Sequence, residues 1–357
     1  MKTWRVGLVG TGYWSEKHLD AWRRIPEVEI AALCDLSPTA LQRRADQYDV
    51  PESHCYGALA EMLAAADIDI VDIVTGPDTH PELVAAAAAA GKHIMCQKPF
   101  ARSAEEARGM VEAAQAAGVR LMVTENWRWL QPFQTIKGVL EEGRLGRVRT
   151  ARYLHTDYYT PRMTPGTELP QPVFRTMPQL LFYEMGVHWY DTWRYLFGTP
   201  KRVYAEMQRI SPHIQGEDTG TVMMGYDNGF YGLLDASWAT RRNLSKPPGP
   251  GVRENHVEQL AIDGEDGTLK LYADGRITIV SRDGLTEATV LETTTLDHGE
   301  SHYRLQRHFV SCLASGAPFQ TGGEDNLITL QMVEAAYTSA REHRPVAIEV
   351  PEAGAES

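Results

Sequence analysis

The chain has 357 residues, 43% hydrophobic and 23% charged, which is typical of a soluble globular protein long enough to form two domains. Its 35 basic and 47 acidic residues give a formal charge of −12, which argues against nucleic-acid binding. The four cysteines form no C-x-x-C pair, the start carries no basic and apolar leader, and no apolar run approaches the ~18 residues of a membrane span, so we expect a cytoplasmic protein without a membrane partner.

A glycine turn connects the first predicted strand, residues 5–9, to a helix at residues 16–24. Gly10 and Gly12 allow a sharp turn and leave no side chain between the helix's first amide groups and a diphosphate. The next strand ends in Asp35, whose carboxylate would accept hydrogen bonds from an adenosine ribose and repel the 2′-phosphate of NADP, and no Arg or Lys occupies the three positions after it. The alternative is a doubly wound domain that binds no nucleotide. We favour NAD, bound through Gly10, Thr11, Gly12, Tyr13, Trp14 and Asp35.

A strand at residues 68–74 should end at the same edge of a parallel sheet as the glycine turn. Thr75 and His80 follow it and are therefore candidates to line the dinucleotide. An alternative, compatible with the first, is a turn in which Asp78 or Thr79 caps the next helix. The remaining elements complete a parallel, doubly wound α/β domain that ends near residue 124, with helices at 38–48, 58–66, 81–90 and 103–117 and strands at 28–34, 93–96 and 119–124.

The sequence Gln97-Lys98-Pro99 follows the strand at 93–96. A lysine fixed at a strand end, beside a proline that stiffens the chain, differs from a solvated surface lysine. If the nicotinamide lies over this crevice, Lys98 becomes a usable proton donor or acceptor. Gln97 is a further candidate for contact with the cofactor.

A polar and aromatic segment, residues 125–129, comes directly after the last strand of this domain. Aromatic rings beside Asn and Arg suit a polyhydroxylated ligand, because the rings stack on its C–H faces and the polar groups bind its hydroxyls. We therefore expect Trp127 and Arg128 to contact the substrate and Asn126 to contact the cofactor. The alternative is that Trp127 and Trp129 only pack the domain junction.

The second domain, residues 125–357, has strand patterns joined by turns of the Asn-Gly or Asp-Gly type, which are typical of hairpins. Such a sheet carries helices on one face only, and helices at 302–315 and 324–342 are expected to form this layer. The open face should join a partner subunit and give a homodimer or homotetramer. This α+β domain should contain a large, mostly antiparallel sheet with strands at 148–156, 202–208, 219–226, 230–237, 257–262, 268–272, 277–281 and 346–350.

Two irregular segments interrupt this pattern. Residues 157–177 are interpreted as a wall of the substrate pocket, with Tyr158 and Arg162 as contacts. Residues 245–251 are interpreted as a mobile loop over a neighbouring pocket, and the end, 352–357, as a disordered tail.

A single, mostly apolar helix is predicted over residues 179–197. Glu184, His188 and Asp191 are four and three residues apart, so they share one stripe, which the apolar surroundings should bury. Buried carboxylates and an imidazole need partners, and such a group in a cleft is where shifted pKa values serve catalysis. A lone buried histidine would more often be structural. Gly186, in the middle of this helix, indicates that another group approaches the backbone closely.

These motifs, in this order and spacing, resemble the Gfo/Idh/MocA family of NAD(P)-dependent oxidoreductases (glucose-fructose oxidoreductase, inositol dehydrogenase, rhizopine catabolism) over nearly the whole length. The resemblance implies that Lys98 positions the nicotinamide and the reacting hydroxyl, while Glu184 and His188 bind the substrate and exchange its proton. Gln97 stands where the family usually has Glu, and Glu184 where it commonly has Asp. Residues 96–99, 125–129 and 216–218 look like the D-apiose dehydrogenase branch.

The expected reaction is the NAD-dependent oxidation of a hydroxyl of a sugar, a sugar derivative or a cyclitol. His188 would take the hydroxyl proton and Lys98 would stabilise the developing alkoxide while the hydride leaves for the nicotinamide. One alternative is a redox-neutral hydrolase or lyase of the same family, in which bound NAD is reduced and reoxidised in each turnover. Another is an NAD-binding regulator without turnover, against which Lys98, Glu184 and His188 argue together. No metal is expected.

Overall fold

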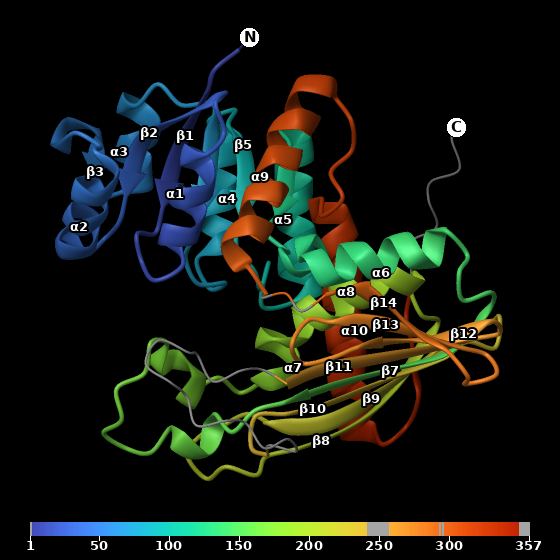
Figure 1. The fold of residues 1–357 in the computed structure, drawn as a ribbon. Helices are drawn as coiled ribbons and strands as arrows, with labels where there is room; N and C mark the ends of the chain where they lie inside the picture. Colours follow the sequence, from blue (N-terminus) through green and yellow to red (C-terminus); the bar gives the residue numbers. More distant parts are fainter. Residues whose placement is uncertain (1, 241–256, 293, 295, 350–357) are drawn as a thin grey trace. The chain divides into compact units, whose positions relative to one another are not determined.

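The computed structural model describes residues 2–240, 257–292, 294 and 296–349, and the chain folds into two compact units (Figure 1). The first unit comprises Met1–Leu130 and Asp297–Leu330, and the second comprises Gln131–Leu296 and Gln331–Ser357. The expected division was 1–124 and 125–357. Residues 245–251 and 352–357 lie outside the described part of the chain. None of the described helices is long and apolar enough to cross a membrane.

The first unit is built on a six-stranded sheet in the order β3-β2-β1-β4-β5-β6, in which neighbouring strands are parallel. Helices connect successive strands, and the predicted doubly wound α/β fold is confirmed (Figure 1). The strand order reverses beside β1, and ligands of such sheets bind at this point, outside the carboxyl ends of the strands. The strands are β1 (Trp4–Val9), β2 (Val28–Cys34), β3 (Cys55–Tyr56), β4 (Ile70–Ile73), β5 (His93–Cys96) and β6 (Leu121–Val123), and the helices are α1 (Ser15–Arg23), α2 (Pro38–Tyr48), α3 (Leu59–Ala65), α4 (His80–Ala89) and α5 (Ala104–Ala116).

Helix α9 (His298–Ser315) belongs to the first unit and packs against α1 (Figure 1). The rings of Trp22, from α1, and Phe309, from α9, meet edge to face with centroids 6.4 Å apart. Both belong to a buried cluster with Ile70 and Met95 of the sheet. The expectation that this helix covers the second sheet was therefore wrong, because its apolar side completes the core of the first unit.

The second unit contains a nine-stranded sheet in the order β14-β13-β12-β11-β7-β10-β9-β8-β15. Strands β7 and β10 pair in parallel, and the other described pairs are antiparallel, as predicted. Sequence patterns missed β14, whose residues are mostly exposed and therefore show no apolar alternation. The strands are β7 (Val148–Thr156), β8 (Arg202–Gln208), β9 (Thr219–Gly225), β10 (Tyr231–Ser237), β11 (Val257–Gly264), β12 (Gly267–Leu271), β13 (Ile277–Ser281), β14 (Glu287–Leu291) and β15 (Val346–Ala347).

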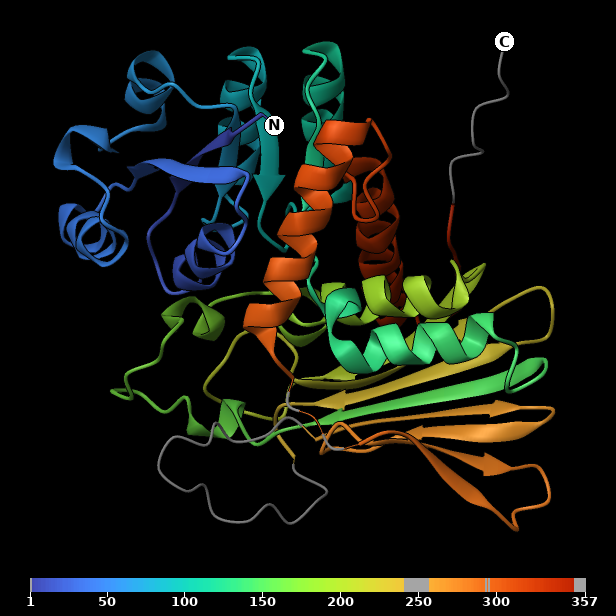
Figure 2. The same cartoon turned by 45° about the horizontal axis from the view of Figure 1, so that its top comes forward.

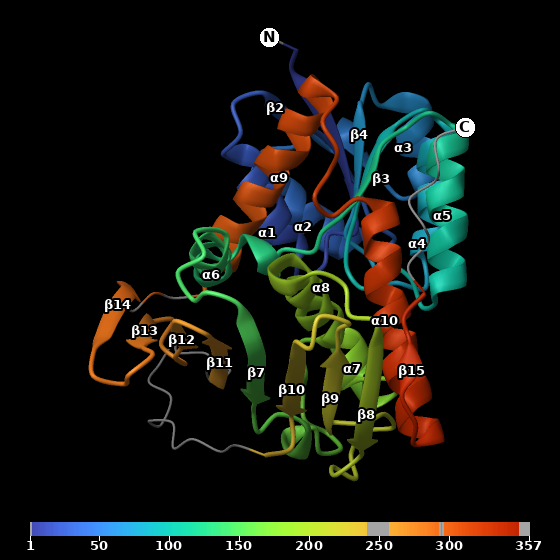
Figure 3. The same cartoon turned by 90° about the vertical axis from the view of Figure 1, so that its right-hand side faces the viewer.

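Helices cover one face of this sheet (Figures 2 and 3). Two glycines allow the close approach: a Cβ on Gly232 would overlap the ring of Trp193, and a Cβ on Gly220 would lie 2.9 Å from the ring of Phe182. No described helix covers the opposite face (Figure 3). The helices of this unit are α6 (Gln131–Glu141), α7 (Leu181–Glu184), α8 (Gly186–Phe197) and the second half of α10 (Gly323–Glu342).

The helix predicted over 179–197 is broken. It consists of α7 and α8, with Met185 between them, so Glu184 ends one helix and Gly186 begins the next. The expected close approach to Gly186 exists, since a Cβ there would lie 3.3 Å from the ring of Tyr190. That group comes from the next turn of the same helix, and the expectation of a mid-helix glycine was wrong.

Candidate active site

The glycine turn has the geometry that a bound diphosphate requires. Gly10 has φ of 95°, and a Cβ on it would lie 2.5 Å from the Val74 carbonyl oxygen, so only glycine fits. A Cβ on Gly12 would meet nothing within 4 Å, which leaves open space at the N-terminus of α1. Backbone amide groups and the positive end of the helix dipole favour an anion there. The residues present therefore fit the diphosphate of a dinucleotide.

Asp35 lies at the end of β2 and reaches across to the glycine turn. Its Oδ2 accepts hydrogen bonds from the Thr11 backbone N (2.5 Å) and the Thr11 hydroxyl (2.8 Å). Its Oδ1 accepts a third from the backbone N of Ser37 at 2.7 Å. Thr11 is fully buried, so it acts as a brace between the acid and the turn. The carboxylate stands beside the turn, as an adenosine-binding acid must.

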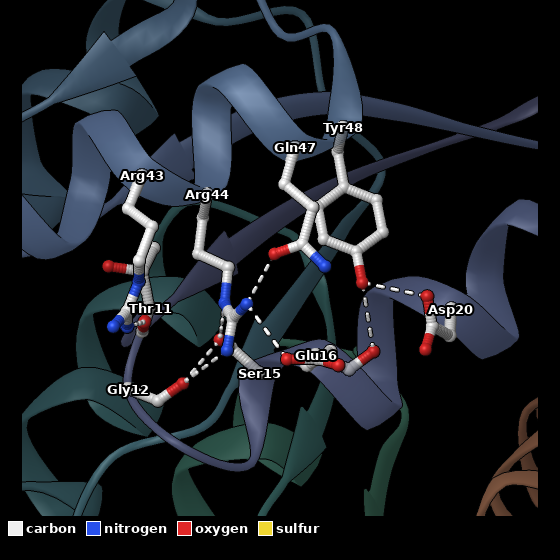
Figure 4. Close-up of polar contacts among 9 residues, drawn as sticks. All are labelled: Thr11, Gly12, Ser15, Glu16, Asp20, Arg43, Arg44, Gln47 and Tyr48. Carbon is white, nitrogen blue, oxygen red and sulfur yellow. Dashed lines mark hydrogen bonds and ion pairs between the residues drawn. The ribbon is translucent and has the colours of Figure 1, made fainter.

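Arg44 is a part of this region that sequence analysis missed (Figure 4). Its side chain, 5% exposed, donates from α2 to the Ser15 hydroxyl (2.9 Å) and to the Gly12 carbonyl (3.3 Å), and it forms an ion pair with Glu16 (3.0 Å). A charge in an amphipathic helix usually faces water. Arg44 instead holds the two sides of the glycine turn together, and no motif in the sequence marks it.

Thr75 and His80 have different positions. Thr75 is half-buried, and its methyl group would lie 2.8 Å from a Cβ on Gly10, so it does adjoin the glycine turn. His80 is fully buried, and its ring nitrogens face the carbonyls of Phe100 (3.0 Å) and Thr75 (3.2 Å). Burial lowers the pKa of His80. The side chain thus braces two loops, and its expected contact with the cofactor stays a prediction.

The alternative for this loop was a turn in which Asp78 or Thr79 caps the next helix, and Thr79 does occupy the N-cap position. The N-cap of α4 is Thr79, without a side-chain bond to the helix. Its hydroxyl donates to the Thr75 hydroxyl at 2.7 Å and lies 2.8 Å from the Gly76 carbonyl. It therefore stabilises the loop itself.

Lys98 follows β5 and is half-buried, and the Lys98–Pro99 peptide is cis. Its backbone N donates to the side-chain oxygen of Gln97 at 2.6 Å. Gln97 is 6% exposed, and both ends of its amide contact other groups of the protein. Its expected contact with the cofactor stays a prediction. The position of Lys98 is thus set by a buried neighbour.

The segment 125–129 belongs to the first unit and is buried there. Asn126 donates to the Ser301 hydroxyl at 2.8 Å, which joins this segment to α9. Arg128 donates to the Gln320 carbonyl at 2.8 Å and lies 3.3 Å from Asp325. The ring of Trp127, 4% exposed, is tilted against His298 at 6.5 Å. These side chains thus pack within the first unit, and their expected contacts with substrate and cofactor stay predictions.

In the second unit, the predicted trio Glu184, His188 and Asp191 is buried, with 7%, 4% and 0% of each residue exposed. Burial raises the pKa of Tyr159, and the nearby charges of Glu184 and Asp157 raise it further. Glu184 thus lies in a polar cluster with the segment that follows β7. The predicted burial of the trio is confirmed.

A histidine on β7, His155, packs against α8 and was not among the residues singled out from the sequence. His155 is fully buried with its ring 5.0 Å from that of Trp189 on α8, and burial lowers its pKa to about 4. It is therefore neutral at physiological pH. Alternation along a strand predicts that one face is buried but does not say which helix covers it, so this contact had no signal in the sequence.

Two expected substrate contacts, Tyr158 and Arg162, lie on the surface of the second unit. Tyr158 is 43% exposed, and the Arg162 guanidinium lies 5.6 Å from the centre of its ring. The nearby aromatic side chains pack together instead, with Tyr159 and Phe174 5.3 and 5.7 Å from Trp238. Tyr158 and Arg162 remain predicted contacts.

Glu217 and Asp218 anchor the start of α7 and the segment that follows β7. Glu217 accepts a hydrogen bond from the backbone N of Phe182 (2.9 Å), and burial raises its pKa. Asp218 accepts from the Thr160 hydroxyl (2.7 Å) and from the backbone N of Ile210 (2.8 Å). These carboxylates anchor α7, and hence Glu184, to the segment after β7. Among the described residues no group of His, Cys, Asp and Glu side chains could hold a metal ion.

The fold and these residues define a two-unit oxidoreductase with a dinucleotide-binding domain and a separate α+β domain. Residues 4–125 match the model of an oxidoreductase family with an NAD-binding Rossmann fold, and residues 133–270 match the GFO/IDH/MocA C-terminal domain. The chain belongs to the GFO/IDH/MocA family of oxidoreductases, as its motifs indicated.

Individual relatives are similar over nearly their whole length. The D-apiose dehydrogenase of Paraburkholderia graminis is 36% identical over 99% of this chain and 92% of its own. That of Rhizobium rhizogenes is 33% identical over 96% of both. The crystal structure of an oxidoreductase from Agrobacterium radiobacter in complex with NAD+, L-tartaric acid and magnesium has a TM-score of 0.86 and 32% identity, and the match covers 97% of this chain and 99% of that one.

Proposed function

We propose that this protein is a cytoplasmic, NAD-dependent dehydrogenase that oxidises a hydroxyl group of a sugar, a sugar derivative or a cyclitol. The observation that carries the proposal is the pair Glu184 and His188, 7% and 4% exposed, at the junction of two buried helices. Burying two ionisable groups costs free energy, so such pairs are concentrated at functional sites. The four cysteines are free, which supports a reducing compartment.

Each unit contributes its own part of the chemistry. Bound NAD supplies the acceptor for the hydride. His188 takes the proton of the reacting hydroxyl as general base, and Glu184 accepts a hydrogen bond from a hydroxyl of the substrate. The Lys98 ammonium stabilises the negative charge that develops on the oxygen. Asp35 and the glycine turn bind the dinucleotide.

D-apiose is the first substrate to test, because the two D-apiose dehydrogenases match nearly all of this chain. Family membership alone does not select a substrate. The oxidoreductase crystallised with L-tartaric acid, at 32% identity, supports small polyhydroxylated compounds more broadly.

The test is formation of NADH by the purified protein with D-apiose, D-xylose, D-glucose and myo-inositol in separate reactions. The proposal requires NADH with at least one of them, its loss in Lys98→Ala and His188→Ala, and its retention in Lys137→Ala, which removes a lysine from α6. A product without net NADH, from protein that co-purifies with NAD, would favour the redox-neutral alternative. No product from any compound in either assay would contradict the proposal.

The open face of the nine-stranded sheet is the proposed subunit interface. Its central row runs across five strands through Tyr204, Met223, Leu233, Arg152 and Ala261, which pair in register. Met223 is 43% exposed, and Leu233 is half-buried beside it. Exposed apolar side chains such as Met223 on an uncovered sheet are typical of an interaction site, which supports a homodimer or homotetramer.

A further inference from the structure

A charged side chain lies in the middle of the parallel sheet. Asp72 on β4 is fully buried, although its strand neighbours are Val71 and Ile73. Its Oδ2 accepts a hydrogen bond from the indole N–H of Trp22 at 2.7 Å. His18, also fully buried, places its Nδ1 2.9 Å from the same oxygen and 3.1 Å from Oδ1. Because a carboxylate only accepts, Nδ1 of His18 carries a proton and donates it.

The other nitrogen of His18 faces Gln97. Gln97 Nε2 lies 3.0 Å from His18 Nε2, while Gln97 Oε1 accepts the hydrogen bond from the Lys98 backbone N. That backbone N–H can only donate, so it fixes which end of the amide is the oxygen. The NH₂ group of Gln97 must then point at His18 and donate to it. His18 Nε2 is therefore the acceptor and carries no proton.

The hydrogen bonds thus form one directed chain from Asp72 through His18 and Gln97 to Lys98. We infer that Gln97 is a positioning residue for Lys98, and that it performs this role by binding His18 as the neutral, Nδ1-protonated imidazole. This inference rests on the proposed function of Lys98, but the state of His18 can be tested apart from activity. Every member except Lys98 is less than 9% exposed, so the chain is shielded from solvent.

Titratable groups from α9 and β5 lie close to His18 and Asp72. On α9, the ring centroid of His302 lies 5.0 Å from that of His18. The His302 ring also stacks on the ring of Trp14, with centroids 6.0 Å apart. On β5, Cys96 lies near Asp72, and burial raises the pKa of its thiol well above the ordinary value, so it is uncharged. The two contacts of Nδ1 with Asp72 therefore set the orientation of the imidazole.

A glutamate at position 97 would remove the donor of the hydrogen bond between residue 97 and His18 Nε2. One carboxylate oxygen would still accept from the Lys98 backbone N, but the other would face the lone pair of His18 Nε2. The bond is restored by one added proton between the two groups, and Asp72 at Nδ1 favours that proton on Nε2, which makes His18 an imidazolium between Asp72 and the new carboxylate. Gln97→Glu should therefore make the position of Lys98 depend on the protonation of His18, and hence on pH.

The first experiment determines directly which nitrogens of the His18 imidazole carry a proton. In protein labelled with ¹⁵N at histidine, without cofactor and at neutral pH, the His18 spectrum should be that of the neutral Nδ1–H form. In Gln97→Glu it should become that of the imidazolium. The His18 signal is identified as the one lost in His18→Asn or, where that variant does not fold, as the one that shifts in Gln97→Glu and not in Gln115→Glu, which adds a carboxylate on the exposed side of α5. A protonated Nε2 in the wild type would overturn the inference whatever the protein's activity.

The second experiment reads the position of Lys98 through the pH profile of kcat/KM. In Gln97→Glu the fall toward basic pH should begin at a lower pH than in the wild type, because loss of the His18 proton breaks the hydrogen-bond chain before the Lys98 ammonium loses its own proton. Gln97→Leu, which keeps neither hydrogen bond, should lose about 100-fold in kcat at all pH values, since displacements of about 1 Å have effects of this size. Its affinity for NAD should stay within about threefold. Identical pH profiles for the wild type and Gln97→Glu, or an unchanged kcat in Gln97→Leu, would show that Gln97 does not position Lys98.

Discussion

Asp35 and Thr11 are joined by two hydrogen bonds to one carboxylate oxygen, at 2.5 Å from the backbone N and 2.8 Å from the hydroxyl. The acid that should select the adenosine ribose therefore also holds the turn that should receive the diphosphate. The contact between Asp35 and Thr11 therefore affects both the selection of NAD and the shape of the diphosphate site. A change at Asp35 must affect both.

Asp35→Ala should weaken NAD binding and reduce discrimination against NADP. Hydrogen bonds to a charged group contribute about 1.5–3 kcal/mol, so the dissociation constant for NAD should rise about 10- to 100-fold. Calorimetric titration with NAD and NADP would measure both effects. Asp35→Asn, which keeps an acceptor for Thr11, should lose less affinity for NAD than Asp35→Ala does. An unchanged ratio of NAD to NADP affinity in both variants would contradict the assigned role.

His188→Ala should lower kcat by about 10²- to 10⁴-fold, the range typical of a lost general base. The affinity for NAD should be unchanged, because Asp35 and the glycine turn belong to the other unit. Rapid-mixing kinetics and a separate NAD titration check the two parts. An equal loss of NAD affinity would instead mark His188 as a structural residue.

Sequence patterns predicted most of the regular elements because these depend on local features. The glycine turn, the strand that ends at Asp35 and the Asn-Gly and Asp-Gly hairpins each need only neighbouring residues. The break at Met185 was missed, since a continuous apolar run favours one helix. The start of α7 is fixed by Glu217, which is far away in the sequence and accepts from the backbone N of Phe182 in the first turn of α7.

The candidate site was predicted less well, because its supporting contacts join segments that are distant in sequence. Arg44 looks like an ordinary charge on an amphipathic helix, and His18 and Asp72 are 54 positions apart. Arg128 was singled out for its chemistry, and its ion pair with Asp325, 197 positions away, could not be read from the sequence. Residue type indicates what a side chain can do, whereas only packing determines whether it faces a ligand.

Gly232→Ala should destabilise the second unit by about 1–3 kcal/mol, because a methyl group there would overlap the ring of Trp193. Gly138→Ala is the matched control in the same unit. Gly138 lies in α6 with open space around its Cβ position, so alanine should stabilise the helix by up to about 1 kcal/mol. Urea unfolding of both variants checks the opposite signs. A stable Gly232→Ala would show that α8 can move away from β10.

Met223→Lys should dissociate the proposed oligomer. An unpaired lysine ammonium at the centre of an apolar interface must be desolvated, and the dissociation constant should rise by more than about tenfold. Light scattering over a concentration series measures the mass. Leu285→Lys places the same charge on another exposed apolar side chain, 82% exposed in the turn before β14, and should leave the mass unchanged. A wild-type monomer, or no effect of Met223→Lys, would exclude the open face as the interface.

Glu217 should make the stability of the second unit fall as pH rises. Burial raises its pKa, although it accepts hydrogen bonds from Tyr337 Oη at 2.6 Å and from the backbone of α7. In the folded state the carboxyl therefore holds its proton at pH values where the unfolded chain has released it. The resulting stabilisation is fully present below the ordinary pKa of glutamate, about 4.3, and is lost as pH rises through the raised value.

Glu217→Gln separates this effect from all other titrating groups, because an amide keeps an acceptor but has no proton to lose. The free energy of unfolding of the wild type, minus that of Glu217→Gln, should decrease as pH is raised from about 4 to 8 and then become constant. Urea unfolding at several pH values gives this difference, and Glu168→Gln, at an exposed position, should give a smaller dependence. A difference that increases with pH would mean that the bonds from Tyr337 and α7 outweigh burial and lower the pKa of Glu217 instead.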